Sequence, residues 1–286
     1  MKVSTIIPYY CHGESIGRAV ASVWNQTKRP HEIIIVDDGS PEKEAAALKH
    51  LAETYPADTL KIIRLPFNQG PGRARNVGWS KAMGDYVAFL DADDIWHPQK
   101  NALQLQLIGS HSECHGICGG SAFVKTSSEI ESGLMNAKLY RLRPIDLLLH
   151  NPVSTRTVML RRDFQLRFAE HKKNSEDYQL FLTAVLMGFN LYFCYTKVAY
   201  RFKAEYGEDG LSGKLRSAHK GHVDSLQRVK DLGLISQTLY LLLRTLAQAK
   251  YYRRRLFVRF GLNRREENFG IFLKQYIPFF RFTSNG

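Results

Sequence analysis

The strongest constraint on the fold is an alternation, repeated through the first third of the chain, of short apolar β-type runs with segments of helical periodicity. Strands are expected at residues 3–8, 32–36, 60–65 and 86–90, and helices at residues 14–26, 42–53 and 72–82. Strands that alternate with helices form a parallel sheet covered by helices on its faces. We therefore predict an α/β fold with a mostly parallel central sheet flanked by helices.

The second half carries weaker patterns. It predicts a helix from Pro98 to about residue 110 and a helix that begins near Ser175, whose apolar face includes Tyr178 and Phe181. Strands are expected at residues 117–124, 158–160 and 192–202, with a loop at 125–138. A long helix is expected from Ile235, with one apolar face formed by Ile235, Leu239, Leu242, Leu243, Leu246 and Ala249 and packed on the rest of the protein.

The net charge of +13 is concentrated at the C-terminal end, because residues 214–286 hold fifteen Lys or Arg against four acids. Residues 250–265 add seven positive charges and no acid, interleaved with aromatic side chains. Such a segment favours peripheral contact with an anionic membrane surface over a merely solvated basic face, and over nucleic acid, which is the least favoured partner. A helical, basic C-terminal extension over 214–286 is therefore expected.

Four cysteines without a secretory leader predict free thiols and a cytoplasmic protein, with peripheral attachment to the inner face of the membrane. No apolar run reaches the length of about 18 residues that a spanning helix needs. His111, Cys114, His115 and Cys118 have spacing that suggests zinc, but they fall across a helix end and a strand. Ordinary buried thiols and surface histidines are the favoured interpretation.

Acidic residues follow two of the expected strands, which end in Asp37-Asp38-Gly39-Ser40 and in Asp91-Ala92-Asp93-Asp94. The carboxyl ends of parallel strands share one edge of a sheet, where ligands bind. An Asp-x-Asp element on a rigid edge suits Mg²⁺ or Mn²⁺ that also bridges substrate phosphates. The alternative is an acidic loop that caps the helix beginning near Pro98.

Four ordered blocks, residues 4–10, 36–40, 70–78 and 89–94, resemble glycosyltransferase family 2. The resemblance implies a GT-A fold, a nucleotide-diphospho-sugar donor and inversion at the anomeric carbon. It implies a catalytic domain at 1–213, with the donor half at 1–97 and the acceptor half at 98–213. The expected function is transfer from a UDP-sugar donor to a glycan or lipid-linked acceptor in cell-surface polysaccharide or lipopolysaccharide synthesis.

The resemblance also assigns donor-side residues, namely Pro8, Tyr10, Asp38, Arg75, Asp91 and Ala92. Asp38 would accept a hydrogen bond from N3–H of uracil, which favours UDP, and Tyr10 would stack on the base or line its pocket. Arg75 would bind the base or diphosphate side of the donor. Asp91 would face the ribose or a metal-bound water, and Asp94 would be structural.

Asp93 would ligate Mn²⁺ or Mg²⁺, the expected cofactor. Family members often have a metal-holding histidine later in the chain, where this sequence has Lys203. A charged lysine cannot ligate a cation, but it could neutralise the diphosphate directly. Glu176-Asp177 matches the family's acidic pair, with Asp177 as general base and Glu176 positioning it or the acceptor. Residues 151–156 correspond to a segment on the acceptor side.

Two competing functions leave features of the sequence unexplained. A sugar-phosphate nucleotidyltransferase would carry a glycine-rich phosphate loop directly after the first strand, where Pro8 is instead followed by Tyr9, Tyr10 and Cys11. A non-catalytic membrane or nucleic-acid binding module would explain the basic extension but not the acidic clusters. Release of UDP from a sugar nucleotide would separate the enzyme from such a module.

Overall fold

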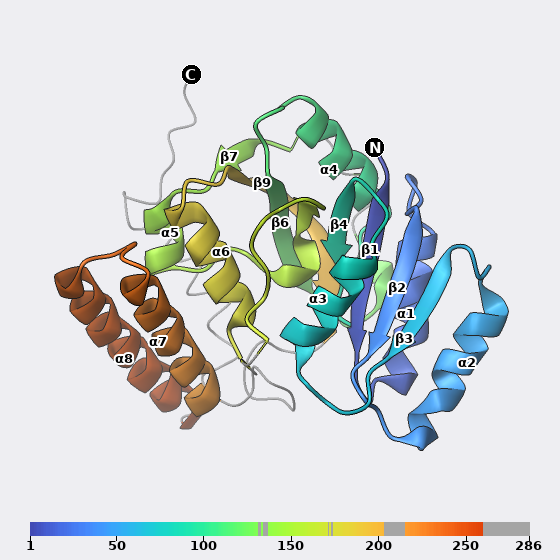
Figure 1. The fold of residues 1–286 in the computed structure, drawn as a ribbon, viewed down its shortest axis with the longest axis horizontal. Helices are drawn as coiled ribbons and strands as arrows, with labels where there is room; N and C mark the ends of the chain where they lie inside the picture. Colours follow the sequence, from blue (N-terminus) through green and yellow to red (C-terminus); the bar gives the residue numbers. More distant parts are fainter. Residues whose placement is uncertain (131–132, 134–136, 171, 173, 203–214, 260–286) are drawn as a thin grey trace.

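A nine-stranded sheet organises the computed structural model, which describes residues 1–130, 133, 137–170, 172, 174–202 and 215–259 (Figure 1). Its main path runs β3-β2-β1-β4-β8-β6-β9-β5, and β7 pairs with β9. The strands are β1 (Val3–Tyr9), β2 (Glu32–Asp37), β3 (Leu60–Arg64), β4 (Tyr86–Phe89), β5 (Asp94–Trp96), β6 (Gly116–Phe123), β7 (Leu139–Arg141), β8 (Met159–Arg161) and β9 (Leu191–Arg201). The α/β class and flanking helices are confirmed.

The first four strands pair in parallel, as the repeated strand-helix alternation predicts. Beyond β4 the sheet is mixed, because β8 is antiparallel to β4 and β6, and β5 and β7 are antiparallel to β9. The purely parallel part is thus confined to the N-terminal half. This half is buried on both faces, and all six residues of β2 are buried.

The helices are α1 (Gly13–Trp24), α2 (Ala45–Thr54), α3 (Pro71–Lys81), α4 (Lys100–Gly109), α5 (Pro144–Leu149), α6 (Glu176–Leu186), α7 (Leu215–Asp231) and α8 (Gln237–Arg259), with single 3-10 turns η1 (Glu42–Glu44), η2 (Ser127–Glu129) and η3 (Thr155–Thr157). The helices predicted in the first half lie within a few residues of their predicted bounds. Short elements β5, β7, α5 and η3 were not predicted, because a strand of three residues carries no readable periodicity.

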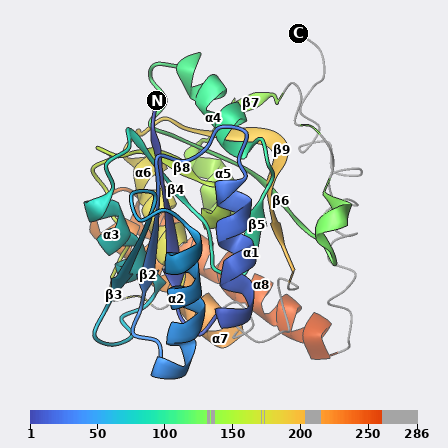
Figure 2. The same cartoon turned by 90° about the vertical axis from the view of Figure 1, so that its right-hand side faces the viewer.

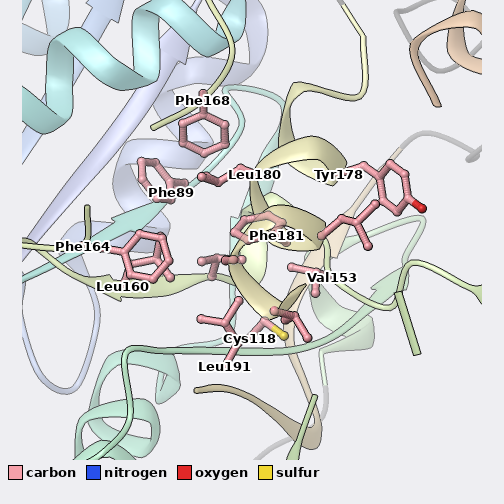
Figure 3. Close-up of a cluster of buried hydrophobic side chains, with 14 of the residues drawn as sticks. Phe89, Cys118, Val153, Leu160, Phe164, Phe168, Tyr178, Leu180, Phe181 and Leu191 are labelled. Carbon is pink, nitrogen blue, oxygen red and sulfur yellow. The ribbon is translucent and has the colours of Figure 1, made fainter. Parts of the chain in front are cut away.

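Two apolar cores lie on opposite faces of the sheet. One lies between the sheet and the helices α1, α2 and α4, and it buries Ile16, Val20 and Val23 at helical spacing. Figure 2 shows α1 and α2 together in front of the sheet. The other packs α3, α6 and α7 on the opposite face. In this second core Phe89 of β4 meets Phe168 edge-on, with ring centroids 5.2 Å apart, and Phe168 contacts Phe181 of α6 (Figure 3).

Close packing of α3 on the sheet depends on Gly78. A Cβ at this position would lie 2.6 Å from Ile6 Cγ2 and 3.2 Å from Val36 Cγ2. Any side chain there would push α3 away from β1 and β2. Since α3 begins directly after Gly70 and carries Arg75 in its second turn, this contact fixes the position of Arg75 relative to the strand ends.

The C-terminal helices lie side by side at the end of the molecule far from α2, with α7 between α6 and α8 (Figure 1). Tyr240, Leu243 and Ala247 of α8 are buried. The predicted packing face is therefore wrong at two positions, because Leu242 is 66% exposed and Ala249 is also exposed. Of the helices described, none combines the length and the apolar character that crossing a bilayer requires.

Candidate active site

Three strand ends meet at one edge of the parallel half of the sheet. Tyr9 of β1 is in register with Asp37 of β2, and Ile6 of β1 is in register with Phe89 of β4. The loops that follow these strands are also bonded to one another. The Cys11 amide donates to the Ser40 hydroxyl at 3.2 Å.

The acidic loop after β4 is attached to the same edge. The Ser15 hydroxyl at the start of α1 donates to the backbone carbonyl of Ala92 at 2.9 Å. Ala92 is itself buried, whereas Pro8 is half-buried and Tyr10 is exposed. The structure therefore places Tyr10, Asp38 and Ala92 in adjoining loops and Pro8 near the end of β1, and Tyr10 is exposed. Their contact with a donor stays a prediction.

Asp38 joins the β2 loop to the loop before α3. It is buried, and its two carboxylate oxygens accept hydrogen bonds from the amides of Gln69 at 2.9 Å and Gly70 at 2.7 Å. Burial raises the pKa of Asp38, and the two amides counteract part of that rise. Gly39 has φ +73°, and a Cβ there would lie 2.5 Å from the Phe67 backbone. The predicted contact of Asp38 with uracil stays a prediction.

Arg75 connects the two halves of the chain. Its guanidinium, whose side chain is 6% exposed, forms ion pairs at 2.7 Å with Asp91 through Nη2 and at 2.7 Å with Glu176 through Nη1. Both are charge-assisted hydrogen bonds in a largely dry setting, where such pairs are strong. The acidic loop after β4 is thereby tied to the first turn of α6. This double pairing was not predicted, and the proposed donor contact of Arg75 stays a prediction.

The two acids that pair with Arg75 differ in their protonation behaviour. Burial alone would raise the pKa of Asp91, but the charge of Arg75 holds it below its usual value. The pKa of Glu176 remains raised, because burial and the neighbouring Asp177 outweigh the arginine. The site thus contains one acid stabilised in its charged form beside one whose proton is held more tightly.

Asp177 is fixed by two hydrogen bonds. The hydroxyl of Thr155, a buried residue of η3, donates to Oδ2 at 3.0 Å, and the Tyr178 amide donates to Oδ1 at 2.7 Å. Acidic residues are favoured in the first turn of a helix by its dipole, and both Glu176 and Asp177 lie there. Contact with η3 brings the predicted acceptor-side segment, residues 151–156, directly to the candidate base.

Helix α7 buttresses the loop that leads into α6. The Lys172 ammonium, which is almost fully buried, donates to the Gly221 carbonyl at 2.8 Å and to the Ser225 hydroxyl at 2.7 Å. The Ser225 hydroxyl in turn lies 3.3 Å from the carbonyl oxygen of Ser175. Ser175 has φ +59°, a left-handed conformation that surrounding contacts must maintain in a non-glycine residue. The turn immediately before Glu176 is thus held by α7.

Tyr178 adds an aromatic contact to this buttress. Its ring stacks on His222 of α7 with centroids 4.4 Å apart and an interplanar angle of 18°. Burial and nearby positive charges lower the pKa of His222 to about 4, so the ring is neutral at physiological pH. A neutral imidazole can pack on the phenol ring without burying a charge. Helix α7 therefore contacts the start of α6 at Ser175, before the candidate base Asp177, and at Tyr178, after it.

The acidic loop offers few ligands for a metal ion. Asp93 is half-buried, while Asp94 is buried and paired with Arg156 at 2.7 Å. Across the described ranges no three His, Cys, Asp or Glu side chains form a group that could hold a metal. Helix α4 begins at Lys100, with Gln99 at its N-cap and no side-chain cap hydrogen bond, so the acidic loop does not cap this helix. That alternative is wrong.

Two further sequence predictions concern residues outside this cluster. Lys203 lies outside the described residues. The zinc spacing involves a buried Cys114 and Cys118, each hydrogen-bonded to a backbone carbonyl, and a His115 ring that accepts from the Asn190 amide at 3.0 Å. Cys114 and Cys118 are buried free thiols, as expected, whereas His111 and His115 are half-buried and not surface residues.

Comparison with known proteins points to one family. The model of the family described as glycosyl transferase family 2 matches residues 4–167. The succinoglycan biosynthesis protein ExoW of Rhizobium meliloti is 40% identical over 129 residues, which cover 43% of this chain and 40% of that protein. The amylovoran biosynthesis glycosyltransferase AmsB of Erwinia amylovora is 29% identical over 197 residues, covering 65% of this chain and 64% of AmsB. The match thus spans less than half of ExoW.

Solved structures show the same fold. The crystal structure of S. aureus TarS 1–349 superposes with a TM-score of 0.65 at 20% sequence identity, covering 90% of this chain and 74% of that chain. TarS 1–349 has also been crystallised in complex with UDP and with UDP-GlcNAc. At this level of identity the likeness extends to the fold.

Proposed function

The chain belongs to glycosyltransferase family 2, and on that premise we propose that it is an inverting transferase that moves a sugar from a UDP-sugar to a hydroxyl of a glycan or lipid-linked acceptor. The observation that carries the proposal is the position of Asp177. Its carboxylate is oriented by Thr155 and lies next to Glu176, which Arg75 ties to the acidic loop after β4. A base from the second half is thereby joined to donor-side residues of the first half.

In the proposed reaction, Asp177 takes the proton of the acceptor hydroxyl as the hydroxyl oxygen attacks the anomeric carbon. A new carbon–oxygen bond forms on the face opposite the diphosphate, the bond to the diphosphate breaks, and UDP leaves. This back-side displacement inverts the anomeric configuration. Glu176, held by Arg75, would position the base or the acceptor.

Electrostatics support a divalent cation, Mn²⁺ or Mg²⁺, as cofactor. The described side chains around the acidic loop and the start of α6 include the carboxylates of Asp91, Asp93, Asp94, Glu176 and Asp177, and the guanidinium groups of Arg18, Arg75, Arg156 and Arg201. A diphosphate that approached these carboxylates would be repelled unless a cation lay between them. Mg²⁺ is commonly held by one or two carboxylates together with substrate phosphates, which suits Asp93 as the ligand. A bound cation would stabilise the charge on the departing diphosphate.

The comparisons support the choice of substrates. TarS, which shares the fold, has been crystallised with UDP and UDP-GlcNAc, and this favours a uridine diphosphate donor. The names of ExoW and AmsB refer to biosynthesis of succinoglycan and amylovoran, which favours a role in polysaccharide synthesis. Peripheral contact with an anionic membrane, supported by the basic residues of α8, would suit a lipid-linked acceptor.

A two-step experiment tests the proposal. UDP-, GDP- and dTDP-sugars are first screened with Mn²⁺ for thermal stabilisation, since a bound ligand raises the apparent stability. UDP release from the best donor is then measured in the presence of a cell-envelope lipid extract. Preference for GDP- or dTDP-sugars would refute the assignment of uridine, and no nucleotide release from any donor would refute transferase activity.

The base is tested with Asp177→Asn. We expect turnover to fall by about 10² to 10⁴, because a positioned general base contributes this much, while UDP affinity stays unchanged. The matched control is Asp163→Asn, which removes an exposed carboxylate that pairs with Arg161 and takes no part in the contacts of Asp177. Wild-type turnover in Asp177→Asn would eliminate the assignment.

A further inference from the structure

One side of α8 carries a stripe of exposed apolar side chains. Leu241 is 49% exposed, Leu242 66%, Tyr252 55% and Leu256 52%. Together with Thr245 and Ala249, which are also exposed, these positions recur at intervals of three or four residues and so share one side of the helix. We call this set, Leu241, Leu242, Thr245, Ala249, Tyr252 and Leu256, the outer face of α8.

The opposite side of the same helix is the one that packs. Tyr240, Leu243 and Ala247 are buried, and α8 is in extensive contact with α7. Figure 1 shows α8 as the outermost helix of the row formed by α6, α7 and α8. The outer face therefore makes no contribution to the core described above, and its apolar side chains are not explained by folding.

The charge of α8 indicates what the outer face binds. Residues 237–259 include six Lys or Arg and no acid. Arg244 and Arg255 are exposed and lie about three turns apart on the same side of the helix, along one margin of the outer face. Arg253, also exposed, lies along the other margin of the outer face, about three turns from Leu242. An apolar stripe between two cationic margins is the arrangement of a helix that lies in the headgroup region of an anionic bilayer.

Polar groups within the stripe are compatible with burial in lipid. The Thr245 hydroxyl donates to the Leu241 carbonyl at 3.0 Å, so its hydrogen is already bonded when the methyl group faces outward. Tyr252 has an apolar ring with a polar tip, a combination favoured at the boundary between lipid and water. Neither residue would bury an unsatisfied donor on docking.

We propose that the outer face of α8 docks the protein on membranes rich in anionic phospholipid, with α8 parallel to the surface. A second copy of the chain is the less suitable occupant, because pairing two outer faces would bring six positive charges of one helix against six of the other. Nucleic acid would use the arginines but leave the leucines exposed. The proposal does not depend on the proposed glycosyl transfer.

The experiment is vesicle flotation with the full chain, without donor or acceptor. Vesicles of phosphatidylcholine alone are compared with vesicles of equimolar phosphatidylcholine and phosphatidylglycerol. We expect recovery with the anionic vesicles only, weakening as salt is raised. Equal recovery with both compositions, or none with either, would overturn the proposal.

Two variants test the two parts of the surface. Replacing Arg244, Arg253 and Arg255 by Ser should lower the partition coefficient about fivefold per arginine, and hence about a hundredfold in all. Leu242→Ser with Leu256→Ser should lower it about tenfold or more, since the leucines would no longer be buried in lipid. Met83→Ser with Met187→Ser is the matched control, because both methionines are similarly exposed but lie outside α8. The control should bind like wild type.

Competing occupants give distinct results. If the leucine variant binds anionic vesicles like wild type, the attraction is to charge alone and the docking face is refuted. If wild type is a dimer in sedimentation and the leucine variant is a monomer with unchanged vesicle binding, the outer face joins two copies instead. If removal of residues 260–286 abolishes binding while both α8 variants retain it, the membrane contact lies outside α8. UDP release by a variant that no longer floats would leave the proposed enzyme activity standing.

Discussion

Replacing Arg75 by Met tests whether the link between the two halves of the chain stabilises the site. The substitution keeps a long side chain but removes both ion pairs, leaving Asp91 and Glu176 without their cation. Glu176 is almost fully buried, so water cannot solvate the carboxylate charge that Arg75 no longer neutralises.

The magnitude follows from the burial of the partners. Breaking a buried ion pair by removing one member costs about 3–5 kcal/mol. Because the Asp91 side chain is 27% exposed, we expect the lower end, about 3 kcal/mol. For a domain of this size each kcal/mol shifts the melting temperature by about 2–4 °C, so the expected decrease is about 6–12 °C.

Arg73→Met is a matched control on the same helix. Arg73 also forms an ion pair at 2.8 Å, with Glu170, but these side chains are 41% and 44% exposed. Exposed pairs contribute about 0–1 kcal/mol. Chemical denaturation of the two variants measures the difference directly, and equal, small losses would refute the idea that the Arg75 pairs support the site.

The pH dependence adds a second readout. In the wild type, the pKa of Asp91 in the folded state lies below its unfolded value, so its contribution to stability is present above the unfolded pKa, near 4, and is lost as pH falls through the folded pKa. Glu176 has the opposite sign, since its raised pKa costs stability as pH rises from about 4.3 through the folded value. Arg75→Met should raise both pKa values, so the variant should lose the most stability at neutral pH and recover part of it on acidification. A deficit that is the same at every pH would contradict this account.

Two further predictions concern the proposed metal ligand and the contact of α7 with the loop before α6. Asp93→Ala should weaken Mn²⁺-dependent UDP binding by at least about tenfold, measured by titration calorimetry. Undiminished affinity would mean that a residue other than Asp93 coordinates the metal ion. Lys172→Met should lower kcat several-fold and the stability by about 1–3 kcal/mol with UDP affinity unchanged, because the loop before α6 loses its hydrogen bonds to Gly221 and Ser225 of α7. Rescue of kcat by Lys172→Arg would support positioning, whereas a loss of UDP affinity equal to the loss of kcat would contradict it.

The parallel half of the sheet was predictable because its signals are local. Each strand is a short apolar run, each helix has its own periodicity, and Asp38 and Asp91 follow directly on strands. The parallel order then places these acids at one edge without knowledge of any distant contact. The shorter elements of the second half, such as β5 and η3, lack such signals, and they hold Asp94 and Thr155 in place.

The contacts that complete the site could not be predicted in this way. Arg75 and Glu176 are separated by 101 positions, and Lys172 and Ser225 by 53. Apart from the family resemblance, which selects Arg75, no local pattern distinguishes it from Arg73, yet one is buried between two acids and the other is exposed. The difference arises from the rotation of α3 on the sheet, which Gly78 sets by its contact with Ile6 and Val36. A sequence pattern can identify the helix, but the facing partners appear only when the tertiary packing is known.

Helix α8 shows the same limit in its amphipathic pattern. Its apolar residues occupy more than one side, so periodicity alone indicates a helix without telling which side packs. The packed side is decided by α7, which covers Leu243 and Ala247 and leaves Leu242 exposed. Leu242 is exposed beside the packed Leu243, on a helix that carries no acidic residue. Its apolar side chain is therefore better explained by contact with a membrane than by packing in the core. For this reason the Leu242 and Leu256 substitutions should change vesicle binding while leaving the melting temperature within about 2 °C of wild type, since exposed sites contribute little to stability.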